Sequence, residues 1–178
     1  MEKPRILLSL CFLVLALLLG CAGAVLWRGH SQQVTLLRTA ERLGYDPSTK
    51  IAQVKRCWDI FSHCGQQLFY ETNLTQVEFA SNLDGLTWDV TNQMTVDGYE
   101  IFTKLNLGTA SRITVSGVDG LGDRSQLPPF KGYRWRLTDP DGRSWAVDYY
   151  PLADQAGPFA INGRALKRNI VQVLYQTR

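Results

Sequence analysis

Few residues of this chain have the types and spacing that catalysis requires. The sequence contains two histidines, His30 and His63. His63 stands directly before Cys64, and cysteine hydrolases use a thiol with an imidazole. Adjacent residues of a helix do not face each other, so this pair indicates a solvent-facing histidine beside a structural cysteine. Cys57, His63 and Cys64 also lack the paired short spacings and the fourth ligand of a structural zinc site. We therefore predict no metal site, and no cofactor, because no phosphate-binding glycine signature occurs.

Carboxylates provide a second possible chemistry. Asp89, Asp97, Glu100 and Asp148 could supply the acid–base pair of a cell-wall or glycan hydrolase. Nothing in their spacing brings two of them within reach of one substrate, because turns and sheet faces account for each one singly. Such a hydrolase is the alternative function, together with a carrier that holds a small ligand in an apolar pocket beneath a sheet.

Two glycine-containing segments hold further acidic residues. Asp139-Pro140-Asp141-Gly142 resembles a fragment of a calcium loop, but apolar residues follow where oxygen ligands would be needed. Proline at its second position and glycine at its fourth predict a β-turn instead. Asp119 and Asp123 lie in a glycine-rich loop over 118–131, where they could contact a partner or a cation.

The best candidate for a binding surface is one face of a predicted hairpin around that turn. Apolar and polar residues alternate on both sides of the turn, which is typical of strands with one buried face. If Trp135 and Trp145 pack on the core, the opposite face is exposed, either as an ordinary solvated sheet face or as an interface. Arginine and tyrosine are enriched at protein interfaces, and this face carries Arg134, Arg136, Arg143, Asp148 and Tyr150.

The sequence patterns predict helices in the first part of the chain and strands after them. This order is typical of an α+β fold. We expect a helix over 31–43 that Gly44 ends. A second helix is expected over 46–64, where Asp46-Pro47 provides a start signal. Thr75-Gln76-Val77-Glu78 is a capping box and predicts a short helix over 76–83.

The remaining segments predict an antiparallel β-meander, because their connections are short. Its expected members are strands over 67–72, 86–90 and 112–116, and a hairpin over 94–106 around Asp97-Gly98. Residues 166–174 fit a helix, which we favour, although the β-branched run within them also fits a strand.

An apolar run precedes this domain. The 22 residues from Ile6 to Trp27 contain no Asp, Glu, Lys, Arg or His. As a helix they would reach about 33 Å, and a bilayer core is about 30 Å thick. Lys3 and Arg5 stand before the run, and a short basic N-terminus stays in the cytoplasm. We therefore predict a single-pass membrane anchor with a periplasmic or otherwise extracytoplasmic domain.

Two other interpretations of this run stay open. Leu18-Leu19-Gly20-Cys21 resembles the lipobox of bacterial lipoproteins, which would make Cys21 the lipidated residue. A cleaved secretory signal is the third possibility, since small residues follow Gly20. All three export the same domain. The predicted organisation is an anchor or signal over 1–27, a stalk helix and linker over 28–45, and the α+β domain over 46–178.

Cys57 and Cys64 are the cysteines that remain for an exported domain. An oxidising compartment favours a disulfide between them. A continuous helix over 46–64 would separate their Cα atoms by about 10.5 Å, beyond the roughly 7 Å limit of a disulfide. Either the helix breaks near Ser62-His63, or both thiols are free.

The formal charge of +3 provides no strong field for nucleic acid. The function predicted from these features is non-enzymatic. We predict a cell-envelope protein, held in the membrane through residues 6–27, that binds another envelope protein. It would be an accessory or assembly subunit, or an inhibitor or immunity protein.

Overall fold

The computed structural model describes residues 3–57, 64–108, 113–115, 130–152, 159–161 and 164–176. The chain divides into two compact units, Met1–Thr35 and Leu36–Arg178. Helix α1 (Lys3–Arg42) provides the first unit and contributes its last turns to the second.

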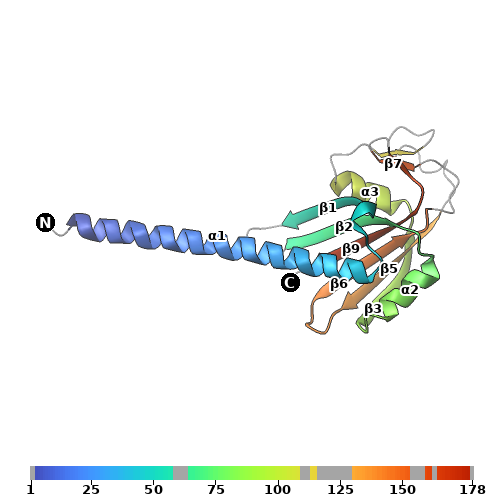
Figure 1. Cartoon of the computed structure of the whole chain (residues 1–178), viewed down its shortest axis with the longest axis horizontal. Coiled ribbons are helices and arrows are strands. Elements are labelled where there is room, and N and C mark those ends of the chain that lie inside the picture. Colours follow the sequence, from blue (N-terminus) through green and yellow to red (C-terminus); the bar gives the residue numbers. More distant parts are fainter. Residues whose placement is uncertain are drawn as a thin grey trace. The chain divides into compact units, whose positions relative to one another are not determined.

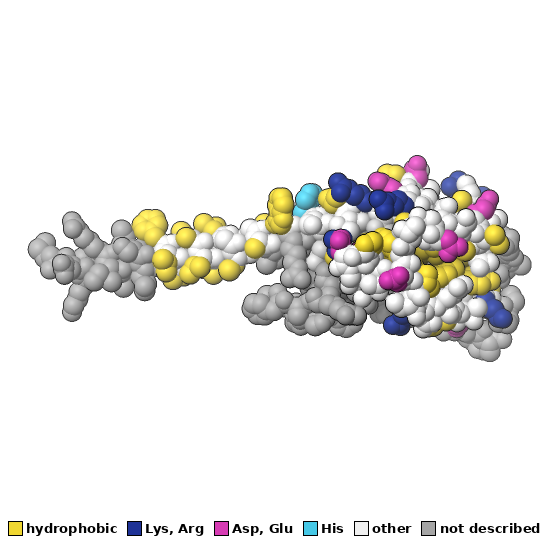
Figure 2. Space-filling model, turned by 90° about the horizontal axis from the view of Figure 1, so that it is seen from below, with side chains coloured by type: hydrophobic (Ala, Val, Ile, Leu, Met, Phe, Trp, Pro, Cys, Tyr) yellow, Lys and Arg dark blue, Asp and Glu magenta, His cyan; other side chains and the backbone are white. Residues whose placement is uncertain are grey.

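The first unit carries exposed apolar side chains around the described part of its helix (Figure 2). The large apolar side chains that the structure describes between Phe12 and Trp27 have between 48% and 76% of their surface exposed. Within the part of the chain that the structure describes, no helix is both long and apolar enough to cross a membrane.

The second unit is an α+β domain built on a six-stranded antiparallel sheet with the order β1-β2-β9-β6-β5-β3 (Figure 1). A smaller antiparallel sheet has the order β4-β7-β8. The strands are β1 (Lys50–Cys57), β2 (Cys64–Thr72), β3 (Asp89–Asp97), β4 (Ile113–Val115), β5 (Lys131–Thr138), β6 (Ser144–Tyr150), β7 (Phe159–Ile161), β8 (Arg164–Leu166) and β9 (Asn169–Gln176). The helices of this unit, besides the end of α1, are the 3₁₀ helix η1 (Pro47–Thr49), α2 (Gln76–Asp84) and α3 (Glu100–Gly108).

One face of the large sheet packs against the end of α1 and against α2. We call this packing the aromatic core. Phe79 of α2 lies against Trp135 and Tyr149, with ring centroids 5.9 and 5.3 Å away. The buried hydroxyl of Tyr70 donates to the carbonyl of Leu43, 3.0 Å away, and so ties the chain just after α1 to the sheet. Burial raises the pKa of Tyr70 far above its usual value, so this donor stays protonated.

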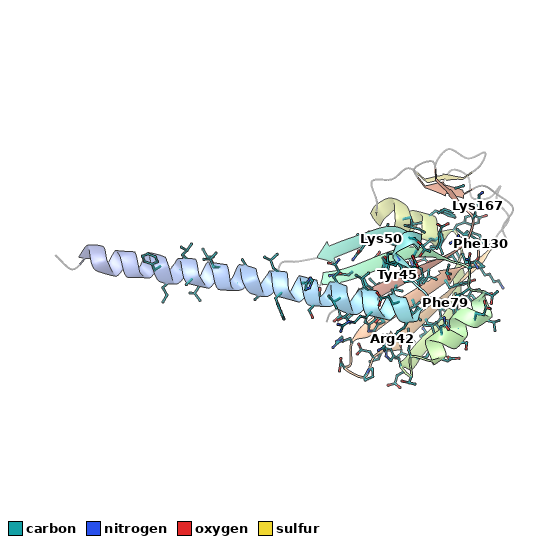
Figure 3. All side chains as sticks on the ribbon, in the orientation of Figure 1. Arg42, Tyr45, Lys50, Phe79, Phe130 and Lys167 are labelled. Carbon is teal, nitrogen blue, oxygen red and sulfur yellow. The ribbon has the colours of Figure 1, made fainter. Side chains whose placement is uncertain are left out.

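The opposite face packs against α3, and we call this packing the α3 core. Ile101, Phe102 and Leu105 of α3 are fully buried there. Phe130, just before β5, belongs to the same core, whereas Phe79 belongs to the aromatic core (Figure 3). The sheet is therefore covered by helix on both faces.

Several predicted local signals are confirmed. Thr75 caps α2: its side chain accepts from the Glu78 backbone, and the Glu78 carboxylate accepts from the Thr75 backbone N–H at 2.8 Å. Gly44 follows α1 with φ at +85°, a left-handed conformation that glycine adopts without strain. The turn Asp139–Gly142 closes the hairpin β5–β6, with Gly142 N–H donating to the Asp139 carbonyl.

The predicted helix over 46–64 is wrong. Asp46 does act as a cap, since its carboxylate accepts from the Ser48 N–H at 2.7 Å, but it caps only η1. Strand β1 follows directly and pairs with β2 as a hairpin. Pairing with β2, together with burial of Ala52 in the α3 core, outweighs the helical spacing of the apolar residues.

The predicted hairpin around Asp97-Gly98 is also wrong, because the chain leaves β3 there and enters α3. The Asp97 carboxylate accepts from the Tyr99 N–H at 2.9 Å. A Cβ at Gly98 would lie 2.3 Å from the Phe130 ring, so this position excludes larger residues. Asp97-Gly98 therefore begins a helix rather than turning a hairpin.

The C-terminal helix is likewise wrong, since residues 169–176 form β9. This strand lies between β2 and β6 in the centre of the sheet. The fold is antiparallel as predicted, but it is not a simple meander, because the last strand inserts between two earlier hairpins. The β-branched run Ile170–Val173 fits a strand that is buried on both faces.

The cap of α2 generates a stability prediction. Thr75→Ala removes the acceptor of the Glu78 N–H, and loss of such a cap costs about 1 kcal/mol of unfolding free energy. Val77, on the same helix and exposed, is the matched control: Val77→Ala should change it by less than about 0.5 kcal/mol. Urea unfolding measures both, and equal effects would contradict the capping role.

Candidate functional site: a charged cluster beneath helix α3

A cluster of ionised side chains lies between the large sheet and α3. Its members are Glu100 and Lys104 of α3, Arg134 of β5, and Asp148 of β6, with the hydroxyl of Tyr150 beside them. The hairpin register sets half of it, because Arg134 and Asp148 are direct partners across β5 and β6. Helix α3 sets the other half, because Glu100 and Lys104 are one turn apart on it.

Arg134 holds the centre of this charged cluster. Its Nε lies 2.8 Å from Asp148 Oδ1 and its Nη2 lies 2.9 Å from Oδ2, a two-point contact. The same Nη2 lies 2.8 Å from Glu100 Oε1. Lys104 makes ion pairs with Asp148 and, at 3.3 Å, with Glu100. Each carboxylate is therefore bound by both cations.

Burial and pairing oppose each other at Asp148, whose side chain is only 3% exposed. Burial alone would raise the pKa of Asp148, but the hydrogen bond from Arg134 and the charge of Lys104 hold it below its usual value. The hydrogen bond from Arg134 to Asp148 keeps the pKa of Arg134 above its usual value. Burial, followed by the nearby charge of Asp148, raises the pKa of Tyr150. Asp148 and Arg134 are thus charged at neutral pH, beside a neutral Tyr150.

This arrangement bears on the acid–base pair considered from the sequence. The structure does bring Glu100 and Asp148 together. A glycosidase needs one carboxyl with a raised pKa to act as the acid, and the pKa of Asp148 is lowered. Asp89 and Asp97 lie at the two ends of β3, both exposed. The geometry is that of a neutral ion-pair cluster, which positions α3 on the sheet.

The binding face predicted from the hairpin is corrected by the same geometry. Asp148 and Tyr150 are buried, and Arg134 is largely covered, with 17% of its side chain exposed. The face is not solvated there, because α3 covers it. Arg136 is exposed. Arg143 is half-buried and pairs with Asp139 and Asp141 in the turn.

The acidic turn is explained by internal hydrogen bonds. Asp139 Oδ1 accepts from the backbone N–H of Asp141 at 3.0 Å and of Arg143 at 2.8 Å. Its Oδ2 accepts from the indole N–H of Trp145 at 3.1 Å. These contacts use the carboxylate to shape the turn, as the turn interpretation predicts. Within the described ranges, no three His, Cys, Asp or Glu side chains converge as they would around a metal.

The other candidate residues lie apart from the charged cluster. Cys21 is exposed on α1. Cys57 and Cys64 are backbone partners at the end of the β1–β2 ladder. Asp119, Asp123 and His63 lie outside the described residues.

Lys104 and Gln172 were missed from the sequence, and Glu100 was considered only as a carboxylate of a β segment. Glu100 and Lys104 share one helix face at the i,i+4 spacing, a signal hidden by the strand interpretation of 94–106. Gln172 of β9 is the backbone partner of Asp148. It is buried, and its amide nitrogen lies 3.4 Å from Gln67 Oε1, while its own Oε1 has no hydrogen-bond partner among the described residues.

Comparison with known proteins does not place the chain in a family. No family model, no curated protein and no solved structure matches it.

Two neighbouring arginines test the structural role of the charged cluster. Arg134→Met should lower the unfolding free energy by about 3 kcal/mol, because removing one partner leaves buried carboxylates undercompensated. Arg136→Met, two residues along the same strand and exposed, should change it by less than about 0.5 kcal/mol. Urea unfolding of both variants measures the difference. Equal values would show that the ion pairs do not hold this face together.

The lowered pKa of Asp148 predicts an acid-dependent loss of stability. A carboxylate whose pKa is lower folded than unfolded stabilises the fold above its unfolded pKa, and loses this effect as pH falls through the folded value. The stability advantage of the protein over Asp148→Asn should therefore be full above pH 3.8, the ordinary aspartate value, and shrink below it. Urea unfolding across this range measures it. An advantage that stays constant into strong acid would contradict the pairing.

Proposed function

We propose that this chain is a non-enzymatic cell-envelope protein. Its N-terminal helix holds it in a membrane, and its α+β domain binds another envelope protein. The observation that carries the proposal is the exposed apolar surface of α1. A helix surrounded by water rarely exposes so many apolar side chains. The uncharged run Ile6–Trp27 continues this surface in the sequence.

The state of the carboxylates supports a binding role over hydrolysis. Glu100 and Asp148 each contact Arg134 and Lys104, so their charges are neutralised within the domain. A general acid would need a proton at neutral pH, which the lowered pKa of Asp148 opposes.

The surface that suits a partner lies at the β3 edge of the sheet. Among the described strands β3 pairs only with β5, so its other edge presents backbone donors and acceptors. Residues Asp89–Gln93 are exposed, including Val90 at 49%. Arg136 is exposed beside them as the partner of Asn92. Such an edge suits an extended segment that adds as a further strand, and the arginine suits an acidic side chain on it.

Crosslinking in native membranes, followed by recovery of the tagged full-length protein, tests this proposal. We expect one stoichiometric envelope partner, whose yield falls several-fold in Arg136→Ala. Arg42→Ala is the matched control, because Arg42 is an exposed arginine in the last turn of α1, which packs on the other face of the sheet. It should leave the yield unchanged.

Two results would contradict the proposal. Absence of any stoichiometric partner would argue against a binding protein. A partner that both variants retain equally would argue against the β3 edge as its contact surface.

A further inference from the structure

The hairpin β1–β2 places two cysteines opposite each other. Its pairing runs without interruption from Ala52 opposite Phe69 to Cys57 opposite Cys64. The cysteines therefore form the last pair of the ladder, with six residues of sequence between them.

This register meets the distance requirement of a disulfide. Direct partners in an antiparallel pair have Cα atoms about 4.5 or 5.5 Å apart. Disulfides span Cα separations of roughly 4.4–6.8 Å. The longer Cα separation expected for a continuous helix does not apply, because Cys57 and Cys64 lie on paired strands and not on one helix.

A disulfide at this end of the hairpin would also hold the edge of the sheet. β2 is held on both sides, by β1 and by β9. β1 is the first strand of the sheet order, with β2 as its only strand neighbour among the described residues. A link between Cys57 and Cys64 would attach the end of this edge strand to a strand that is already fixed.

We propose that Cys57 and Cys64 form a disulfide that closes the β1–β2 hairpin. The inference rests on the proposed function in one respect, because disulfides persist in compartments outside the cytoplasm. The oxidant is the disulfide of a thiol–disulfide oxidoreductase. One cysteine thiolate attacks it to form a mixed disulfide and release one thiolate of the oxidant. The second cysteine thiolate then attacks the mixed disulfide, which forms the Cys57–Cys64 bond and releases the reduced oxidant. Two electrons pass to the oxidant, and the two cysteines lose their protons.

The test has two arms on the full-length protein. In the first, cells are treated with a thiol-alkylating maleimide before lysis, and mass spectrometry examines the peptide that carries both cysteines. In the second, purified protein in detergent is equilibrated with oxidised and reduced glutathione and then alkylated. Cys57→Ser should abolish the bond in both arms, and Cys21→Ser should leave it intact in both.

We expect the peptide to lack two hydrogens and to carry no maleimide in both arms. We also expect Cys57→Ser/Cys64→Ser to remain folded, with its Tm lowered by roughly 5 °C. Alkylated thiols in the purified folded protein would overturn the disulfide and leave the proposed function untouched. A bond that forms in the purified protein but is absent in cells would instead overturn the extracytoplasmic location and the disulfide that depends on it.

Discussion

The large sheet depends on its last strand. β9 pairs with β2 along eight residues and with β6 along seven, so it joins the β1–β2 hairpin to the strands β3, β5 and β6. Its residues Ile170–Val173 are buried on both faces, where Val171 and Val173 enter the aromatic core and Ile170 enters the α3 core. Because the contacts of β9 are distant in sequence, both cores are completed only when the C-terminal end of the chain docks.

The charged cluster follows from this packing. The sheet face that α3 covers carries Arg134, Asp148 and Gln172 at its middle, on three adjacent strands. An entirely apolar helix would bury these polar groups without hydrogen-bond or charge partners. Helix α3 solves this by packing Ile101, Phe102 and Leu105 on the apolar part while Glu100 and Lys104 meet the charges. Buried ion pairs add little net stability. Here they join α3 to β5 and β6.

Sequence patterns predicted the local chemistry well and the tertiary choices poorly. The capping box at Thr75, the left-handed Gly44 and the hairpin turn at Gly142 were readable, because each depends on neighbours within a few residues. The segments 46–64 and 166–174 were misread, because pairing with distant strands decided between helix and strand. The charged cluster could be predicted only in part from the sequence. The hairpin register places Arg134 opposite Asp148, but the helix that buries them came from a segment interpreted as β.

Alkaline carbonate extraction of membranes tests most directly the central claim, that an apolar helix holds this domain in a membrane. We predict that the full-length protein stays in the pellet and that Cys21→Ser stays with it. Leu15→Arg/Leu18→Arg should move it to the supernatant, because each arginine at the centre of a membrane helix costs about 2.5–3.5 kcal/mol. Leu15→Ala/Leu18→Ala is the control and should remain in the pellet. Release of the unaltered protein would contradict the account, and release of Cys21→Ser alone would replace the helix with a lipid anchor.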